Sequence, residues 1–293
     1  MSTRLPNPPP DKAGAPPSLA AHLPASLAAT LTGQWASLAT LIADWQRAAA
    51  RPLLIGLSGA QGSGKSTLAA HLVQQLTTRH GLHAATVSLD DFYLTRAQRQ
   101  QLASTIHPLF VTRGPPGTHD LPLMDKTLAA LRQPGPDSST GTAIPRFEKP
   151  SDDRAPAASW PRVHVPLDVV ILEGWCLGAR PQDPADLIAP LNQLEAEEDP
   201  HLVWRQHINQ QLATSYVRLW TSLDKLLLLQ APSWSAICTW RAEAEARLPG
   251  GPAMTLAQLS RFMQHYERTA RTLLATPPAA DMVWCLDAQR RVT

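Results

Sequence analysis

The octapeptide G-A-Q-G-S-G-K-S at residues 59–66 constrains the fold of this chain more than any other feature. It follows the apolar run of residues 53–57, which is typical of a buried parallel strand, and it opens a helix predicted over residues 66–80. Glycines at this spacing let backbone N–H groups turn inward around phosphate oxygens, and the helix N-terminus adds a dipole that favours anions. An ordinary glycine-rich turn would leave the Lys-Ser pair and its strand and helix unexplained.

The octapeptide therefore predicts a loop that binds the phosphates of a nucleotide. In such a loop Lys65 reaches the β- and γ-phosphates, and the hydroxyl of Ser66 is a ligand of Mg²⁺. ATP and Mg²⁺ are the expected cofactors. The predicted nucleotide-binding residues are Gly59, Ala60, Gln61, Gly62, Ser63, Gly64, Lys65, Ser66 and Thr67.

Four further apolar runs are expected to complete a sheet. They lie at residues 83–89, 168–172, 225–230 and 282–286, and the segments between them are long enough for the crossover helices that parallel strands require. The predicted fold class is α/β, with a five-stranded parallel sheet flanked by helices.

The rest of the chain divides into one domain and a tail. Residues 26–293 are predicted to form a single domain that begins with a helix over residues 27–50. Residues 1–25 hold seven prolines and few large apolar groups, so they bury too little surface to offset the entropy of ordering and are predicted to be disordered. Residues 133–160 show no sustained period, which predicts a long loop that is either disordered or a functional lid. The L-P-G-G-P string at residues 248–252 is predicted to separate two helices.

Charge and hydropathy argue against several classes of partner. The 26 basic and 24 acidic residues are spread along the chain, without the basic stripe that follows a nucleic-acid backbone. The longest apolar runs fall far short of the ~20 residues that cross a bilayer, and the first residues lack the apolar core of a secretory signal. Cys176, Cys238 and Cys285 show no zinc or redox spacing and are interpreted as buried thiols. These features predict a cytoplasmic protein with no nucleic-acid or membrane partner.

Carboxylates follow two of the predicted strands, at the edge where open α/β sheets bind ligands. Glu173 ends the run of residues 169–172 and is expected to hold Mg²⁺ directly or through water, although a strand-end glutamate is often simply solvated. Asp90 and Asp91 follow the run of residues 83–89. A carboxylate there can accept the proton of an attacking hydroxyl, whereas a helix N-cap is the alternative role for an aspartate. We assign the catalytic base to Asp90.

Several strings in order then indicate a family. GAQGSGKST, SLDDFYLT, RGPPGTHD, ILEGW and YERTAR together resemble the uridine kinase, pantothenate kinase and phosphoribulokinase group of P-loop kinases. Within that group the sequence from about residue 53 to residue 292 is most similar to D-glycerate 3-kinases of the plant and fungal type. The resemblance implies a P-loop NTPase fold with a helical lid and transfer of the ATP γ-phosphoryl group to the 3-hydroxyl of D-glycerate. An Asp-x-Phe-Tyr element carries the base in the wider group, which supports Asp90 over Asp91.

The resemblance and the local chemistry together suggest substrate-binding residues. A small carboxylate substrate needs a cation, and Arg113, Lys149 and Arg154 lie in polar segments predicted to face the strand ends. A solvated loop charge is the alternative for each of them. His119 and Asp120 are predicted to hydrogen-bond substrate hydroxyls, or His119 caps the segment that follows. The segment after Lys149 is shorter than in the plant enzymes, which leaves the identity of the hydroxy acid open.

A lid is predicted at about residues 234–255, where this kinase group covers the phosphates. Arg241 is predicted to meet the γ-phosphate there, as an arginine finger supplied by the same chain. The alternative is a surface ion pair at i,i+4 spacing with Glu245.

Two other functions stay open at this stage. A kinase of a nucleoside or a pantothenate-like alcohol would share these motifs, although residues 114–120 offer no aromatic side chain for stacking on a base. A guanine-nucleotide switch would carry an Asn-Lys-x-Asp element, which the sequence lacks. The predicted partner is a small-molecule hydroxy acid, and the chain is expected to be a monomer or a homodimer.

Overall fold

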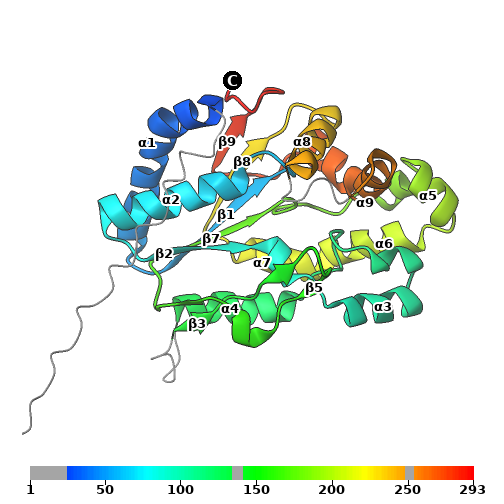
Figure 1. Cartoon of the computed structure of the whole chain (residues 1–293), viewed down its shortest axis with the longest axis horizontal. Coiled ribbons are helices and arrows are strands. Elements are labelled where there is room, and N and C mark those ends of the chain that lie inside the picture. The colour runs from blue at the N-terminus through cyan, green and yellow to red at the C-terminus, as the bar shows by residue number, and fades with distance from the viewer. Residues whose placement is uncertain (1–24, 134–140, 248–253) are drawn as a thin grey trace, which may run out of the picture.

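A computed structural model describes residues 25–133, 141–247 and 254–293 (Figure 1). The predicted disordered tail lies outside these residues except for Ala25, which begins helix α1 (Ala25–Ala49). The predicted break at residues 248–252 also lies outside them. In the described part of the chain, no helix is both long and apolar enough to cross a bilayer.

The five predicted strands form one parallel sheet in the order β2-β7-β1-β8-β9. Their bounds are β1 Leu53–Gly59, β2 Ala84–Ser88, β7 Val169–Gly174, β8 Lys225–Gln230 and β9 Met282–Cys285. The prediction of a five-stranded parallel sheet is confirmed. Because all strands run the same way, the loops after β1, β2 and β7 meet at one edge of the sheet.

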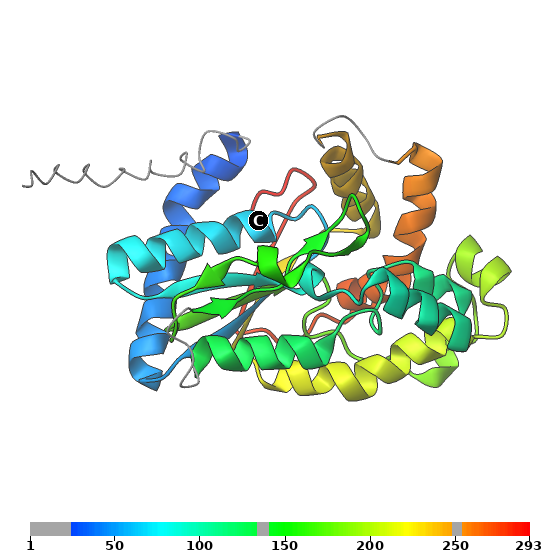
Figure 2. The ribbon, with the colours of Figure 1, turned by 60° about the horizontal axis from the view of Figure 1, so that its bottom comes forward.

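Helices cover both faces of the sheet (Figures 1 and 2). On one face lie α1, α2 and α8, and on the other lie α4, α6, the π-helical turn η7 and α7. Helix α9 contributes side chains to the cores on both faces. The bounds are α2 Lys65–His80, α4 Leu121–Arg132, α6 Val203–Gln211, η7 Leu212–Tyr216, α7 Val217–Thr221, α8 Trp234–Ala246 and α9 Leu256–Ala275. The remaining helical elements in the described part of the chain are η2 Leu89–Phe92, α3 Arg96–Thr105, η3 Pro108–Val111, η5 Ala157–Ser159, η6 Pro184–Leu187 and α5 Gln193–Glu198.

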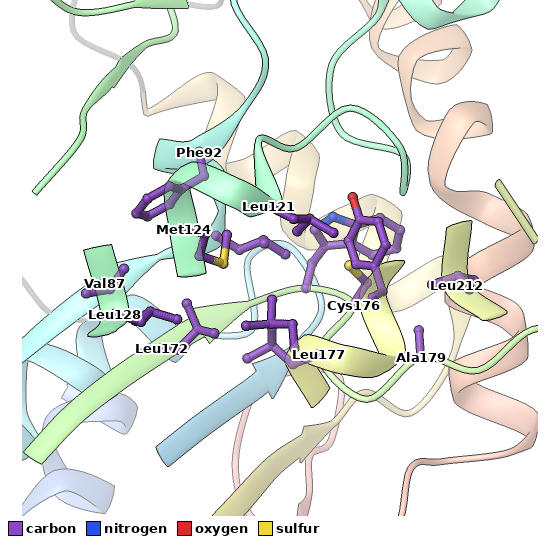
Figure 3. Packing of buried hydrophobic residues seen from close by; sticks show 14 of the residues in the cluster. Val87, Phe92, Leu121, Met124, Leu128, Leu172, Cys176, Leu177, Ala179 and Leu212 are labelled. Atoms are coloured by element: carbon purple, nitrogen blue, oxygen red, sulfur yellow. The ribbon is translucent and has the colours of Figure 1, made fainter. Parts of the chain in front are cut away.

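The core consists of two layers because successive strand residues point to opposite faces. In β7, Val169 and Ile171 join the layer beneath α1 and α2, whereas Val170 and Leu172 join the layer beneath α4. Figure 3 shows Met124 and Leu128 of α4 packed over Leu172. Full burial of each such side chain contributes about 1.5–3 kcal/mol, so the sheet is a rigid base for the loops at its edge.

The described part of the segment predicted to be a long loop contains short strands. The antiparallel pair of β4 Phe147–Glu148 and β5 Asp153–Arg154 lies within it, and β3 Thr142–Ala143 pairs with β6 Arg162–Val163, which follows the segment. Strands of two residues leave no period to detect in the sequence, which is why the described part of this segment was predicted to be irregular.

The cysteines correct another expectation. Cys176 is buried, but Cys238 is half-buried and Cys285 is exposed. Cys285 lies in β9, an edge strand whose alternate residues face outward, so a buried position was the wrong prediction for it.

Candidate active site

The glycine-rich loop joins β1 to α2, and two of its glycines are required by the backbone. Gly64 caps α2 with φ at 95°, and Gly62 has φ at 77°, values that residues with a Cβ rarely adopt. A Cβ on Gly62 would lie 2.7 Å from the Cβ of Trp240 and 2.9 Å from its carbonyl oxygen. The loop is therefore pressed against α8, and its shape depends on that helix.

Lys65, Ser66 and Glu173 converge at the start of α2. The Ser66 hydroxyl donates to Glu173 Oε1 at 3.0 Å, and Lys65 Nζ lies 3.8 Å from Glu173 Oε2. Register explains the meeting, because Glu173 in β7 pairs with Leu57 of β1, two residues before the loop begins. The residues predicted to hold the nucleotide phosphates and the metal thus lie side by side.

The environment of Glu173 fits a hard cation. Its side chain is 6% exposed, and Oε2 has no hydrogen-bond donor among the described residues. The Lys65 ammonium, 3.8 Å away, is beyond hydrogen-bond distance, so a buried oxygen that is costly to leave unsatisfied can still take a closer cation. Mg²⁺ takes oxygen ligands and is commonly bound by one or two protein groups together with substrate phosphates. Glu173 and Ser66 would supply that protein share.

Asp90 lies at the end of β2, facing cations and a tyrosine. Its Oδ2 is 3.0 Å from Lys149 Nζ, and its Oδ1 accepts a hydrogen bond of 2.8 Å from the Tyr93 hydroxyl. Burial disfavours the charged form of Asp90, but the charges of Lys149 and Lys65 and the Tyr93 hydrogen bond outweigh burial and hold its pKa well below the usual range. Asp90 is therefore an ionised carboxylate at neutral pH, close to the phosphate-binding lysine.

Asp91 points elsewhere. It accepts hydrogen bonds from the Arg146 guanidinium at 2.8 Å and from the Phe147 backbone N–H at 3.1 Å. Burial is the largest influence on it and raises its pKa above the usual value, even though these donors act in the opposite direction. Asp91 holds strand β4 in place, whereas its neighbour faces the phosphate-binding loop.

The three predicted substrate cations differ in their surroundings. Lys149 is 61% exposed and contacts Asp90. Arg113 pairs with Asp152, a partner that sequence reasoning missed, and lies 5.5 Å above the Phe147 ring. Arg154 donates to the side chain of Asp120 and to the backbone carbonyl of Tyr93, both at 2.9 Å. Lys149 is thus the most accessible of the three, and both arginines tie the β4–β5 hairpin to the sheet edge.

His119 and Asp120 have separate surroundings. Asp120 is the N-cap of α4, with its side chain accepting from the Leu123 N–H, so the capping role considered for His119 belongs to its neighbour. His119 is buried, stacks on the Tyr93 ring at 4.8 Å and lies 2.6 Å through Nδ1 from the Tyr216 hydroxyl. Burial lowers the pKa of His119 to about 4, against a smaller opposite influence of Asp90, so the ring is neutral at pH 7.

Arg241 lies on α8, one residue after the tryptophan that contacts the glycine-rich loop. It forms the i,i+4 ion pair with Glu245 at 2.7 Å and lies 5.8 Å over the Phe262 ring. The pair is not a surface pair, since the two side chains are 19% and 3% exposed. The role of Arg241 at the γ-phosphate stays a prediction.

Comparison with known proteins gives one partial match to a family model and longer matches to kinases. A family model described as the N-terminal region of nephrocystin 3 matches residues 31–114, less than half of the chain. The chloroplastic D-glycerate 3-kinase of Arabidopsis thaliana is 32% identical over 251 residues, which cover 80% of this chain and 52% of the plant protein. The uncharacterized kinase mug58 of Schizosaccharomyces pombe is 33% identical over 228 residues, which cover 74% of this chain and 79% of that protein.

A solved structure extends the likeness to three dimensions. D-glycerate 3-kinase from Cryptococcus neoformans superimposes with a TM-score of 0.72 and 28% identity, covering 89% of this chain and 96% of that one. The chain belongs to the D-glycerate 3-kinase-like P-loop kinases. It spans about half the length of the plant relative.

Two further residues support the site of this P-loop kinase, and sequence reasoning did not assign either of them. The Tyr266 hydroxyl donates to the Arg113 carbonyl at 3.0 Å, and a Cβ on Gly114 would lie 1.8 Å from that hydroxyl. Arg290 donates from Nε to the Gly62 carbonyl at 2.6 Å and has a rare φ of 65° for a residue with a side chain. Tyr266 begins the Y-E-R-T-A-R string, a signal that could have found it, whereas Arg290 lies in no motif.

Proposed function

We propose that this chain is an ATP-dependent kinase that requires Mg²⁺ and phosphorylates the 3-hydroxyl of D-glycerate, giving 3-phosphoglycerate. The observation that carries the proposal is the convergence of Lys65, Glu173 and Asp90 at the carboxyl ends of three adjacent strands, β1, β7 and β2. Glu173 pairs in register with Ser88 of β2, so the base candidate and the P-loop flank the same carboxylate. The names of the plant and Cryptococcus relatives supply the choice of acceptor.

In the proposed reaction the acceptor hydroxyl oxygen attacks the γ-phosphorus while the bond to the β–γ bridging oxygen breaks. ADP leaves, and the proton of the hydroxyl passes to Asp90. Lys65 contacts the transferred phosphoryl group, and Arg241 on α8 supplies a second positive charge. When bound at Ser66 and Glu173, Mg²⁺ would neutralise charge on the β- and γ-phosphates.

The acceptor would bind beneath the β4–β5 hairpin. Lys149 is the cation best placed to bind its carboxylate, because the Nζ lies beside Asp90. Since the Lys149 side chain is exposed, it can leave the Asp90 carboxylate and pair with that of the substrate. The same space would be lined by Arg113, Arg154 and Asp120, which also hold the hairpin to the sheet. His119, which stacks on Tyr93, would face the substrate from the side of that ring.

A coupled ADP-release assay tests this function. The purified chain would be supplied with ATP, Mg²⁺ and one acceptor at a time: D-glycerate, L-glycerate, other hydroxy acids, uridine and pantothenate. We expect D-glycerate to give the highest kcat/KM, with removal of Mg²⁺ abolishing turnover. Preference for uridine or pantothenate would overturn the acceptor, and ATP hydrolysis that ignores every acceptor would favour a nucleotide switch.

We further propose a cytoplasmic monomer or homodimer without a nucleic-acid or membrane partner. The nearly balanced charge, +2 in total, supports the absence of a polyanion partner. The plant relative is chloroplastic by name, so the compartment needs its own test. Cell fractionation with an antibody against the chain would locate it, and light scattering would give its mass in solution.

A further inference from the structure

Helices α6 and α7 are joined without a break by one π-helical turn, η7 (Leu212–Tyr216). A π-turn inserts one extra residue into a helix and is frequently found at functional sites. Here the turn ends at Tyr216, whose side chain is fully buried and reaches the loop that contains His119. The irregular turn therefore delivers one hydroxyl group to the substrate side of the sheet.

The hydrogen bonds of Tyr216 determine where its proton lies. Its oxygen accepts from the Gly117 backbone N–H at 2.9 Å and lies 2.6 Å from His119 Nδ1. Among the described residues, His119 Nδ1 is the only acceptor that the hydroxyl hydrogen can reach. If Nδ1 carried a proton instead, the Tyr216 hydrogen and the lone pair on His119 Nε2 would both be left without a partner. The tyrosine hydroxyl therefore donates to Nδ1, and the neutral ring carries its proton on Nε2.

The Nε2–H of His119 is then a buried donor with no partner in the described part of the chain. Such a donor is costly to leave unpaired, so a ligand oxygen that satisfies it gains affinity. The ring stacks on Tyr93, and the hydroxyl of Tyr93 donates to Asp90. The unpaired donor thus belongs to the same cluster as the candidate base.

We propose that Tyr216 is a positioning residue that fixes His119 as the Nε2-protonated tautomer, so that His119 donates a hydrogen bond to the substrate oxygen next to the reacting hydroxyl. For D-glycerate, that oxygen is the 2-hydroxyl, because the 3-hydroxyl faces Asp90 and the carboxylate faces Lys149. This choice of oxygen rests on the proposed function. The assignment of the tautomer does not, because it follows from the hydrogen bonds of the protein alone.

The tautomer is tested without substrate. Long-range ¹H–¹⁵N spectra of the full chain at pH 7 distinguish the two neutral forms of an imidazole, and loss of one signal set in His119→Gln assigns the ring. We expect the Nε2-protonated form in the wild type and a mixture in Tyr216→Phe. Thr118→Val is the matched control, because it removes a different buried hydroxyl, in the loop that carries His119, while leaving Tyr216 in place. Nδ1 protonation in the wild type, or an unchanged ring signal in Tyr216→Phe, would overturn the proposal.

The substrate contact is tested by kinetics. Loss of one hydrogen bond predicts a rise of about fivefold to tenfold in the KM for D-glycerate in Tyr216→Phe, with a smaller effect on kcat and on the KM for ATP. 3-Hydroxypropanoate lacks the 2-hydroxyl, so the same variant should leave its KM within twofold. His119→Gln, which keeps a donor near Nε2, should retain more activity than His119→Ala. An equal rise in KM for both acceptors in Tyr216→Phe would refute the contact with the 2-hydroxyl. A wild-type protein that is inactive on D-glycerate would refute the proposed function, and the spectra would then test the tautomer by themselves.

Discussion

The adjacent aspartates Asp90 and Asp91 give the most direct test of the site, because the same chemical change should have a large effect on activity at one position and a small effect at the other. Asp90→Asn keeps the shape of the side chain and removes the proton acceptor, so we expect kcat to fall by about 10²-fold or more with little change in the KM for ATP. Asp91→Asn should stay within about threefold of the wild type, because this side chain contacts Arg146 and Phe147 and not the reacting groups.

Neither substitution is expected to unfold the protein, and the reasons differ. Asp90 is one-third exposed and its partner Lys149 is 61% exposed, so this pair contributes at most about 1 kcal/mol. Burial raises the pKa of Asp91, so its environment disfavours the charge that asparagine removes. An asparagine oxygen can still accept the Phe147 N–H. Asp91→Ala, which leaves that donor unpaired, should cost about 1–3 kcal/mol.

The assay is steady-state ADP release with D-glycerate saturating and Mg²⁺ in excess, accompanied by urea unfolding of each variant. Phosphoryl transfer is often described as passing through a loose transition state, in which the base contributes more to positioning than to deprotonation. The comparison of the two variants is therefore more informative than either alone. If Asp91→Asn lost more activity than Asp90→Asn at equal stability, the assignment of the base to Asp90 would be wrong.

Three other perturbations follow from the structure. Lys65→Ala should abolish phosphoryl transfer with unchanged circular dichroism, and turnover within tenfold of the wild type would contradict its role. Gly62→Ala should raise the KM for ATP at least tenfold and lower the free energy of unfolding by about 2–4 kcal/mol. The reasons are that the new methyl group meets Trp240 and that the backbone has a positive φ. An unchanged KM would contradict this packing argument. Burial lowers the pKa of both His119 and His265 to about 4, so between pH 6.5 and 4 the unfolded chain binds more protons than the folded protein. The free energy of unfolding should therefore fall as the pH falls through that range, by about 2 kcal/mol per histidine at pH 5. Denaturation at pH 7 and pH 5 measures this loss, which His265→Gln should reduce.

The sequence predicted those parts of the protein that depend on short stretches of chain. The five strands are short apolar runs, and the structure has each of them within one or two residues of the predicted bounds. The P-loop combines a strand, a glycine turn and a helix within contiguous residues, so Lys65 and Ser66 could be placed before any contact was known. Glu173 was also predictable, because parallel strands bring their carboxyl ends to one edge.

Only the tertiary structure decided which neighbouring groups face each other. The sequence favoured Asp90 over Asp91 through the Asp-x-Phe-Tyr element of the family, but it did not show the partners of either side chain. Those partners, Lys149 and Arg146, come from a hairpin whose strands are too short to leave a pattern. Residues 133–160 were predicted to be irregular for the same reason.

The longest-range contacts were the least predictable. Tyr216 and His119 are 97 residues apart, and Arg290 and Gly62 are 228 residues apart. A hydrogen bond between such residues depends on where two packed elements place a pair of atoms, within a few tenths of an ångström, and it leaves no periodic trace in either segment. The sequence by itself therefore determined the sheet, the phosphate-binding loop and the class of chemistry. The packing of the elements decided the direction of each carboxylate and the tautomer of the buried histidine, because those depend on partners that the chain brings together only when it folds.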